Sequence, residues 1–268
     1  MKPPRDKKSK KSLRSFEKTS MKWYVGYFIV LVLFIWSIIG MEIDPERISV
    51  GLPRMGYIIA DMVPPETAEL ENSVIGMLET IQIAVIGTTI AAILSIPVGF
   101  MAARNIGVPG PITVAGKQIL NAIRTFPALV FGIFFVASYG PGPLAGVMAL
   151  GINSIGMLGK LNSEVVESID QGPIEALEAT GANRVEIFLY AVAPQVLPEF
   201  IGTTLYRFEL NLRRATVLGL VGAGGIGVTL LQSLQFRRWS VVGMSLLVII
   251  VVVTIIDYSS AYVRKKII

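Results

Sequence analysis

The chain has 268 residues, of which 53% are hydrophobic and 16% charged, with a formal net charge of +5. A soluble domain of this size would carry about a quarter charged residues, so the composition argues against a soluble protein and predicts a polytopic membrane protein. The chain has neither cysteine nor histidine, which removes disulfides, thiolate nucleophiles, imidazole bases and the usual zinc ligands. We therefore predict no catalytic residue and no metal site.

The first segment, residues 1–22, is strongly basic. It holds nine Lys and Arg residues against Asp6 and Glu17. A basic arm can bind nucleic acid, but one placed directly before an apolar span more often sets orientation by the positive-inside rule, with some attraction to anionic lipid. We predict a disordered cytoplasmic arm and no nucleic-acid partner.

The first apolar run covers 23–41 and opens with the aromatic pair Trp23 and Tyr24, as is typical of an interfacial anchor. Nineteen residues fill most of a bilayer core of about 30 Å, and no cleavage pattern follows, so we predict a retained transmembrane helix. The next segment, 42–73, lies in a stretch rich in acids and poor in Lys and Arg. It is therefore predicted to be an external loop.

Two further uncharged tracts follow. The first runs from Thr80 to Ala103 and contains Pro97, which predicts a kink. The second, 125–159, is too long for one crossing, and "YGPGP" at 139–143 divides it into two helices joined by a tight outer turn. The first of these should begin near Lys117 and the second should end around Lys160.

The C-terminal part permits two counts of spans. One crossing over about 195–214, with 215–236 partly re-entrant or lining a cavity, and a last span over 241–263 give six spans and place the basic tail, 264–268, in the cytoplasm with the N-terminus. Two crossings before the last span would give seven. We choose six.

A polar stretch at 175–194, "EALEATGANRVEIFLYAVAP", interrupts the apolar pattern. Its sequence predicts a helix–turn–helix. Pro173 suits a first helical turn, and Gly181 is placed to end that helix. Asn183 and Glu186 have the spacing of a capping box for a second short helix, which Pro194 should stop. Two short helices are marginal in water, so this cytoplasmic hairpin needs a partner surface.

The same stretch resembles the coupling motif of ABC-importer permeases, in which Glu-Ala-Ala is followed three residues later by Gly and nine residues after that by Ile-x-Leu-Pro. Ala191 and Ala193 replace the aliphatic residues of that pattern. The resemblance implies a coupling loop over 161–194 that docks in an ATPase subunit. The candidate coupling residues are Glu175, Ala176, Leu177 (in place of the second Ala), Gly181 and Pro194.

A second string, "RFELNLRRATVLGLVGAGGIG" at 207–227, resembles the corresponding region of phosphonate-importer permeases, as do "AARN" at 102–105 and "RTFP" at 124–127. The part "VGAGGIG" is shared with methionine-type permeases. The resemblance covers about 75–263 and implies a permease domain over 74–263, all-α, with about six transmembrane helices and a type I ABC-importer fold.

The charges in this string separate by helical face. Steps of 100° put Arg207, Asn211 and Arg214 within about 60° of one another, where they would meet an oxyanion in the pathway. Glu209 and Arg213 fall on the opposite side, in the favourable acid-first order four residues apart, and we predict a structural ion pair between them. The alternative is that the arginines only hold helices together or lie near a membrane interface.

The glycines of the string have two interpretations of equal weight. They permit close helix packing, or Gly222, Gly224 and Gly225 form a turn that lines the pathway and offers backbone amides to an anion. No Lys-Ser/Thr follows them, so they are not a nucleotide loop.

The function that the resemblance implies is the permease of an ATP-driven importer for phosphonate or a related phosphorus oxyanion, such as phosphite or a phosphate ester, in the bacterial inner membrane. Its partners would be two ATPase subunits, a second permease copy, an extracytoplasmic solute-binding protein and the lipid bilayer. ATP and Mg would be bound by the ATPase, and no cofactor by this chain. The alternatives are a methionine-type permease, a membrane-embedded enzyme acting on phosphate-bearing substrates through Glu209 and the arginines, and a passive channel or scaffold.

Overall fold

A computed structural model describes residues 21–41, 44–105 and 110–267, so most of the predicted basic arm lies outside the described residues. The chain divides into two compact units, one ending at Tyr57 and the other beginning at Ile58. The first unit contains α1 (Met21–Gly40) and most of α2 (Pro45–Asp61). Side chains of α1 from Trp23 onward are exposed on all sides, which is expected of an apolar helix made to lie in lipid.

The second unit is entirely helical in the part that the structure describes. Its elements, in chain order, are η1 (Thr67–Glu69), α3 (Leu70–Ala102), α4 (Gly110–Thr125), α5 (Ala128–Tyr139), α6 (Pro143–Glu167), α7 (Gly172–Ala179), α8 (Arg184–Ile187), the π-helical segment η2 (Phe188–Val192), α9 (Ala193–Gly219), α10 (Ile226–Gln235) and α11 (Trp239–Ile267).

The centre of this unit is the packing of α3 against α6. A Cβ atom added to Gly87 would lie 3.1 Å from the Cβ of Leu150, and one added to Gly99 would lie 3.0 Å from the Cβ of Asn162. Small residues at such positions let two helices approach closely. Within a lipid bilayer, where the hydrophobic effect does not drive helices together, this close packing stabilises their association. α3 continues as helix through Pro97 to Ala102.

Five of the described helical segments are long and apolar enough to cross a membrane, and α4 with α5, bent by 82° at their junction, form a sixth if counted as one broken span. This agrees with the predicted six spans. α10 has ten residues, about 15 Å of helix, too short for a bilayer core of about 30 Å. The segment 215–236 therefore contributes the end of α9, a turn and a short helix, and no seventh span.

Three helix boundaries differ from the prediction. α6 runs to Glu167, past Lys160, where the ion pair of Lys160 with Glu164 stabilises an extra turn. The helix expected to begin near Lys117 begins at Gly110 and breaks before Pro127, because a residue that precedes proline is disfavoured in the helical region.

The third difference concerns Pro194, which does not stop the second helix of the hairpin. It lies at the first turn of α9, where its missing N–H group is tolerated, and the wider turn of η2 joins α8 to α9. The result is one helical rod of 36 residues from Arg184 to Gly219.

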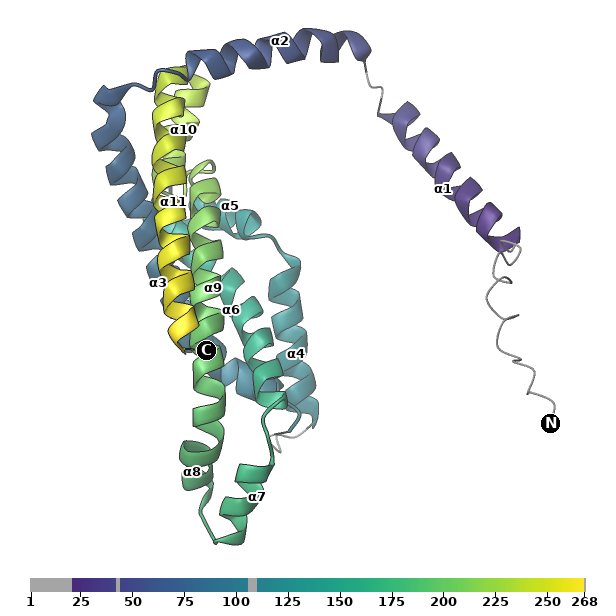
Figure 1. Cartoon of the computed structure of the whole chain (residues 1–268), viewed down its shortest axis with the longest axis vertical. Coiled ribbons are helices and arrows are strands. Elements are labelled where there is room, and N and C mark those ends of the chain that lie inside the picture. The colour runs from purple at the N-terminus through teal and green to yellow at the C-terminus, as the bar shows by residue number, and fades with distance from the viewer. Residues whose placement is uncertain (1–20, 42–43, 106–109, 268) are drawn as a thin grey trace, which may run out of the picture. The chain divides into compact units, whose positions relative to one another are not determined.

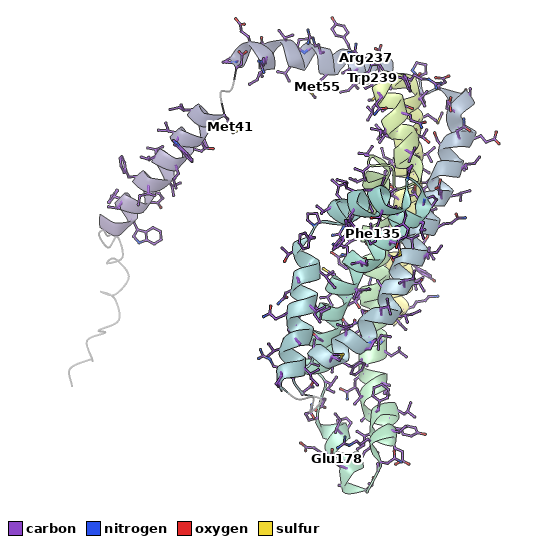
Figure 2. The ribbon with its side chains drawn as sticks, turned by 180° about the vertical axis from the view of Figure 1, so that it is seen from behind. Met41, Met55, Phe135, Glu178, Arg237 and Trp239 are labelled. Carbon is purple, nitrogen blue, oxygen red and sulfur yellow. The ribbon has the colours of Figure 1, made fainter. Side chains whose placement is uncertain are left out.

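The second unit is elongated, and its two ends differ (Figure 1). α7 and α8 form a hairpin that projects at one end, here called the hairpin end, with Glu178 near its tip. α10 and the start of α11, with Trp239, lie at the opposite end, the turn end (Figure 2). The rod of α8, η2 and α9 runs between the two.

Candidate functional site

The predicted pathway residues of α9 lie together in a polar network inside the second unit. Arg207 is 2% exposed; its Nε donates to Ser154 Oγ at 2.9 Å and its Nη2 to Asn153 Oδ1 at 2.7 Å. Arg214 Nη1 donates to the same Asn153 oxygen at 3.1 Å. Asn211, fully buried, donates to Ser154 Oγ at 2.8 Å and to Thr88 Oγ1 at 2.9 Å. The network therefore joins α9 to α6 and α3.

Arg207 and Arg214 both line a cavity of about 440 Å³, which we call the arginine cavity. Arg124, the last basic residue of α4, lines it too, because the break between α4 and α5 brings the "RTFP" segment against α9. The remaining lining residues are Phe126, Pro127, Ala128, Leu129, Asn153, Met157, Val217 and Leu218.

The arginine cavity carries an excess of positive charge. Among the residues that the structure describes, no ion pair joins Arg124, Arg207 or Arg214 to an acidic side chain. Charged groups within a membrane are costly unless they face a cavity, a partner or each other. Three guanidinium groups at one cavity are therefore suited to an anionic ligand.

The predicted ion pair between Glu209 and Arg213 is wrong. Glu209 pairs with Arg264, and Arg213 pairs with Asp257, both of α11. The guanidinium of Arg264 also lies over the ring of Tyr206, 5.9 Å from its centre. α11 packs along this face of α9 and supplies partners from 44 and 55 residues away, a distance at which sequence spacing carries no signal. The assignment of these charges to the face opposite Arg207 is correct.

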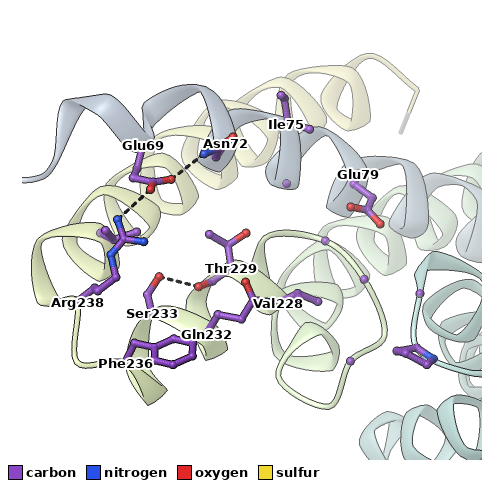
Figure 3. Close-up of a pocket in the computed structure, with 17 residues that line it drawn as sticks. Glu69, Asn72, Ile75, Glu79, Val228, Thr229, Gln232, Ser233, Phe236 and Arg238 are labelled. Carbon is purple, nitrogen blue, oxygen red and sulfur yellow. Dashed lines mark hydrogen bonds and ion pairs between the residues drawn. The ribbon is translucent and has the colours of Figure 1, made fainter.

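The glycine turn after α9 lines a second cavity, of about 710 Å³, at the turn end (Figure 3). Gly222, Gly224 and Gly225 form one wall, and polar side chains of α3 and α10 form others. Figure 3 shows Glu69 of η1 held by Asn72 at 2.8 Å and by Arg238 at 3.0 Å, with Glu79 further along α3.

The two interpretations of the glycine string apply to different glycines. Gly224 and Gly225 have φ of 84° and 74°, a region that L side chains rarely adopt, and a Cβ on Gly225 would lie 2.4 Å from Thr80 Oγ1. Gly219 and Gly227 pack α9 against α10, since a Cβ on Gly219 would lie 2.5 Å from the Cα of Gly227. The turn lines a cavity, and the glycines flanking it permit close packing.

Four of the five candidate coupling residues lie in the projecting hairpin, and the fifth, Pro194, lies in the first turn of α9. Glu175, Ala176 and Leu177 belong to α7, which has no buried residue and contacts only α8 and η2 among the described elements. Gly181 ends α7 with φ of 79°, and Ala182 N–H donates to the Leu177 carbonyl oxygen at 3.1 Å. The predicted termination at Gly181 is therefore confirmed.

The capping box of the second short helix is also confirmed. Asn183 Oδ1 accepts from the backbone N–H of Glu186 at 3.0 Å, and the Glu186 carboxylate accepts from that of Asn183 at 2.7 Å. On the adjacent outer surface Val185, Leu189 and Tyr190 are 54–73% exposed. A hairpin with fixed geometry and exposed apolar side chains is suited to a protein partner.

Sequence reasoning missed several residues that complete these sites. Asn153 and Ser154 anchor the arginines, and their only signal was polar character within an apolar span. Arg124 belongs to "RTFP", a segment whose sequence does not indicate a contact with α9. Gln195 braces the base of the hairpin: its Oε1 accepts from Asp170 N–H at 2.9 Å, and its Nε2 donates to Ala191 O at 2.8 Å.

A set of apolar spans around a cationic cavity, with one projecting hairpin, is the architecture of a membrane transport permease. Residues 95–268 match the family described as "Binding-protein-dependent transport system inner membrane component". The chain belongs to this family and is a multi-pass inner-membrane protein.

Three of the relatives are named as permeases. The chain is 40% identical to the phosphite transport system permease protein PtxC of Stutzerimonas stutzeri over 239 residues, 89% of this chain and 86% of the relative. It is 38% identical to the phosphate-import permease protein PhnE of Mycolicibacterium smegmatis over 230 residues, 85% of this chain and 43% of that longer relative. A D-methionine permease of Vibrio cholerae matches at 24% over 151 residues, 56% of this chain and 62% of the relative.

The solved structures support the fold. A chain of the MetNI methionine ABC transporter, crystallised in inward-facing conformations, superposes with a TM-score of 0.66 at 19% identity, covering 76% of this chain and 99% of that chain. The fold is therefore all-α and of the type I ABC-importer permease kind, as the sequence predicted.

Proposed function

We propose that this permease imports a phosphorus oxyanion, phosphite or a phosphonate, by alternating access. The observation that carries the proposal is the arginine cavity, where Arg124, Arg207 and Arg214 meet without an acidic partner among the described residues. Guanidinium groups match the geometry of tetrahedral oxyanions, and two relatives that are 40% and 38% identical to this chain over the aligned residues bear the names of phosphite and phosphate permeases. A zwitterionic amino acid has no net charge, so three cationic groups would complement it less well than they complement an anion.

The cavity is suited to passing an anion on without holding it tightly. Arg207 is fixed by Ser154 and Asn153, whereas Arg214 shares one hydrogen bond and remains half-buried. Arg124 and Phe126 are exposed at the edge of the cavity. A second copy of the chain would enclose the anion from that open side, which is why we propose a homodimer.

The hairpin is proposed to dock on a separate ATPase subunit through Glu175, Ala176 and Leu177. The helical rod from Arg184 to Gly219 joins the hairpin directly to Arg207, about 35 Å away at 1.5 Å per residue. Closure of two ATPase subunits around ATP and Mg would move this rod and open the cavity outward, and hydrolysis would reset it. This chain would perform no chemistry.

An extracytoplasmic solute-binding protein would deliver the anion. In the proposed topology both termini and the hairpin lie in the cytoplasm. The second cavity, which the glycine turn lines, then faces outward, and substrate would enter past Gly222, Gly224 and Gly225. Basic residues at 264–266 in the last turn of α11 and the basic arm support this orientation by the positive-inside rule.

Transport by the assembled system tests the substrate. The permease, its ATPase and its binding protein are reconstituted in liposomes, and uptake of radiolabelled phosphite, methylphosphonate and methionine is compared with and without ATP. ATP-dependent uptake of a phosphorus oxyanion is expected. Methionine uptake alone would support the methionine-type alternative, flux without ATP a passive channel, and substrate turnover without the ATPase an enzyme.

Labelling of a single cysteine tests the orientation, since the chain has no cysteine of its own. Cysteine placed at Glu178, near the tip of the hairpin, should react with a membrane-impermeant maleimide only after the inner membrane is opened. Reaction in intact spheroplasts would contradict the proposed topology and the coupling role with it.

A further inference from the structure

α2 has an apolar stripe that nothing in the described structure covers. Ile48, Leu52, Met55 and Ile59 follow one another at spacings of four, three and four residues, so at 100° per residue they occupy an arc of about 60°. Each is between 53% and 64% exposed, and no residue of α2 is buried. A row of large apolar side chains on one face of a helix is not stable facing water alone.

The opposite side of α2 carries the charged residues of the helix, together with Val50 and Tyr57. Arg47 and Arg54 project more than about 100° from the centre of the apolar arc, as do Glu46 and Asp61. Arg47 pairs with Asp44 at 3.4 Å. Acids and bases nearly balance on this helix, so its attraction to a surface would come from apolar burial and not from net charge.

The residues after α2 lie where two spans begin. Glu66 N–H donates to the Ser240 carbonyl oxygen at 3.2 Å, and Arg238 pairs with Glu66 at 3.7 Å. Met62 packs against Gly243, since a Cβ there would lie 2.3 Å from the Met62 carbonyl oxygen. Met62, the residue directly after α2, is therefore held against the start of the α11 span.

The short connection between α1 and α2 restricts the position of the N-terminal end of α2. α1, an apolar span, ends at Gly40, and α2 begins at Pro45, five residue steps that reach about 17 Å at most. α2 has 17 residues, about 25 Å of helix. An α2 standing upright would carry Pro45 farther from the membrane than this connection allows, so the helix must lie down toward the surface.

We infer that α2 is an interfacial helix that buries Ile48, Leu52, Met55 and Ile59 at the boundary between lipid headgroups and acyl chains. Amphipathic helices with a narrow apolar face bind membranes in this way, and the binding scales with the apolar area buried. The occupant of this face is the bilayer surface itself. The inference does not depend on which anion is transported.

A depth measurement on the full-length chain tests the inference. Single cysteines replace Leu52 or Met55 on the apolar face, and Arg47 or Arg54 on the charged face as matched controls. Each variant is labelled with an environment-sensitive fluorophore and placed in phosphatidylcholine nanodiscs, with or without a nitroxide-labelled lipid. Probes at 52 and 55 should emit at shorter wavelength and be quenched at least about twofold more than probes at 47 and 54.

A second variant separates lipid burial from a merely folded helix. Replacing Ile48 and Ile59 by Ser should weaken quenching of the probe at 55 while the chain still elutes as a single species. Equal quenching at all four positions would overturn the inference. So would quenching that needs anionic lipid, or shielding that arises only when the solute-binding protein is added, since the latter would make this face a protein-docking surface.

Discussion

One helical rod joins the hairpin, through α8, to Arg207 of the arginine cavity, yet these two regions are built differently. From Gly172 to Ile187 no residue is buried, and the bonds that shape the hairpin join residues a few positions apart. In the cavity Arg207 is 2% exposed, and its partners, Ser154 and Asn153, lie 53 and 54 residues away. One region is local and exposed and therefore free to engage a partner; the other is non-local and buried, so its geometry depends on the packing of several helices.

The largest effect is expected from Gly181→Pro in the hairpin. Proline fixes φ near −65°, whereas Gly181 has φ of 79° and donates its N–H to the Glu178 carbonyl oxygen at 3.0 Å. ATP-dependent uptake should fall to background while the protein still inserts in the membrane. Gly181→Asn is the matched control, because Asn tolerates the left-handed region, and it should keep most of the uptake. Normal uptake by the proline variant would show that hairpin geometry is not needed for coupling.

The next effect concerns the cavity. Arg207→Gln keeps a hydrogen-bond donor for Ser154, where Arg207 Nε donates, but removes the charge, and it should lower uptake about tenfold or more, equivalent to at least ~1.4 kcal/mol of lost stabilisation. ATPase activity of the complex should persist, because the hairpin is unchanged. Arg213→Gln, on the opposite face of α9, serves as control. If both variants lose uptake equally, the arginines only hold helices together.

A smaller effect, on stability, is expected between α9 and α11. Arg264→Ala leaves Glu209, whose side chain is 11% exposed, without its partner, and should lower the free energy of unfolding by about 3 kcal/mol. Replacing both residues by Gln should recover most of this loss. Thermal unfolding in detergent measures the change, and a double variant no more stable than the single one would mean that the pair is not the cause.

The smallest effect is expected at the base of the hairpin, on the part of α9 that leads to the arginine cavity. Gln195→Leu removes the bonds to Asp170 and Ala191 at the base of the hairpin, each worth about 1 kcal/mol. Uptake should fall by about threefold, with more ATP hydrolysed per anion transported. Glu199→Gln, one turn further along α9, is the control. An unchanged ratio of hydrolysis to transport would show that the base of the hairpin needs no brace.

The sequence by itself determined the features that depend on neighbours in the chain. The apolar spans, the turn at 139–143, the termination at Gly181 and the capping box of Asn183 and Glu186 all follow from local backbone chemistry and the lipid environment, and the structure has each of them. The common face of Arg207, Asn211 and Arg214 follows equally from helical periodicity.

Only the tertiary structure decided which groups those side chains meet. Glu209 pairs with Arg264 instead of Arg213, because α11 packs on that face of α9, and Arg124 reaches the cavity because the chain bends by 82° before α5. The same holds for Pro194, which joins two helical segments through η2 instead of ending one. Such pairings depend on distances between helices, and helical periodicity fixes the direction of a side chain without saying what stands opposite it.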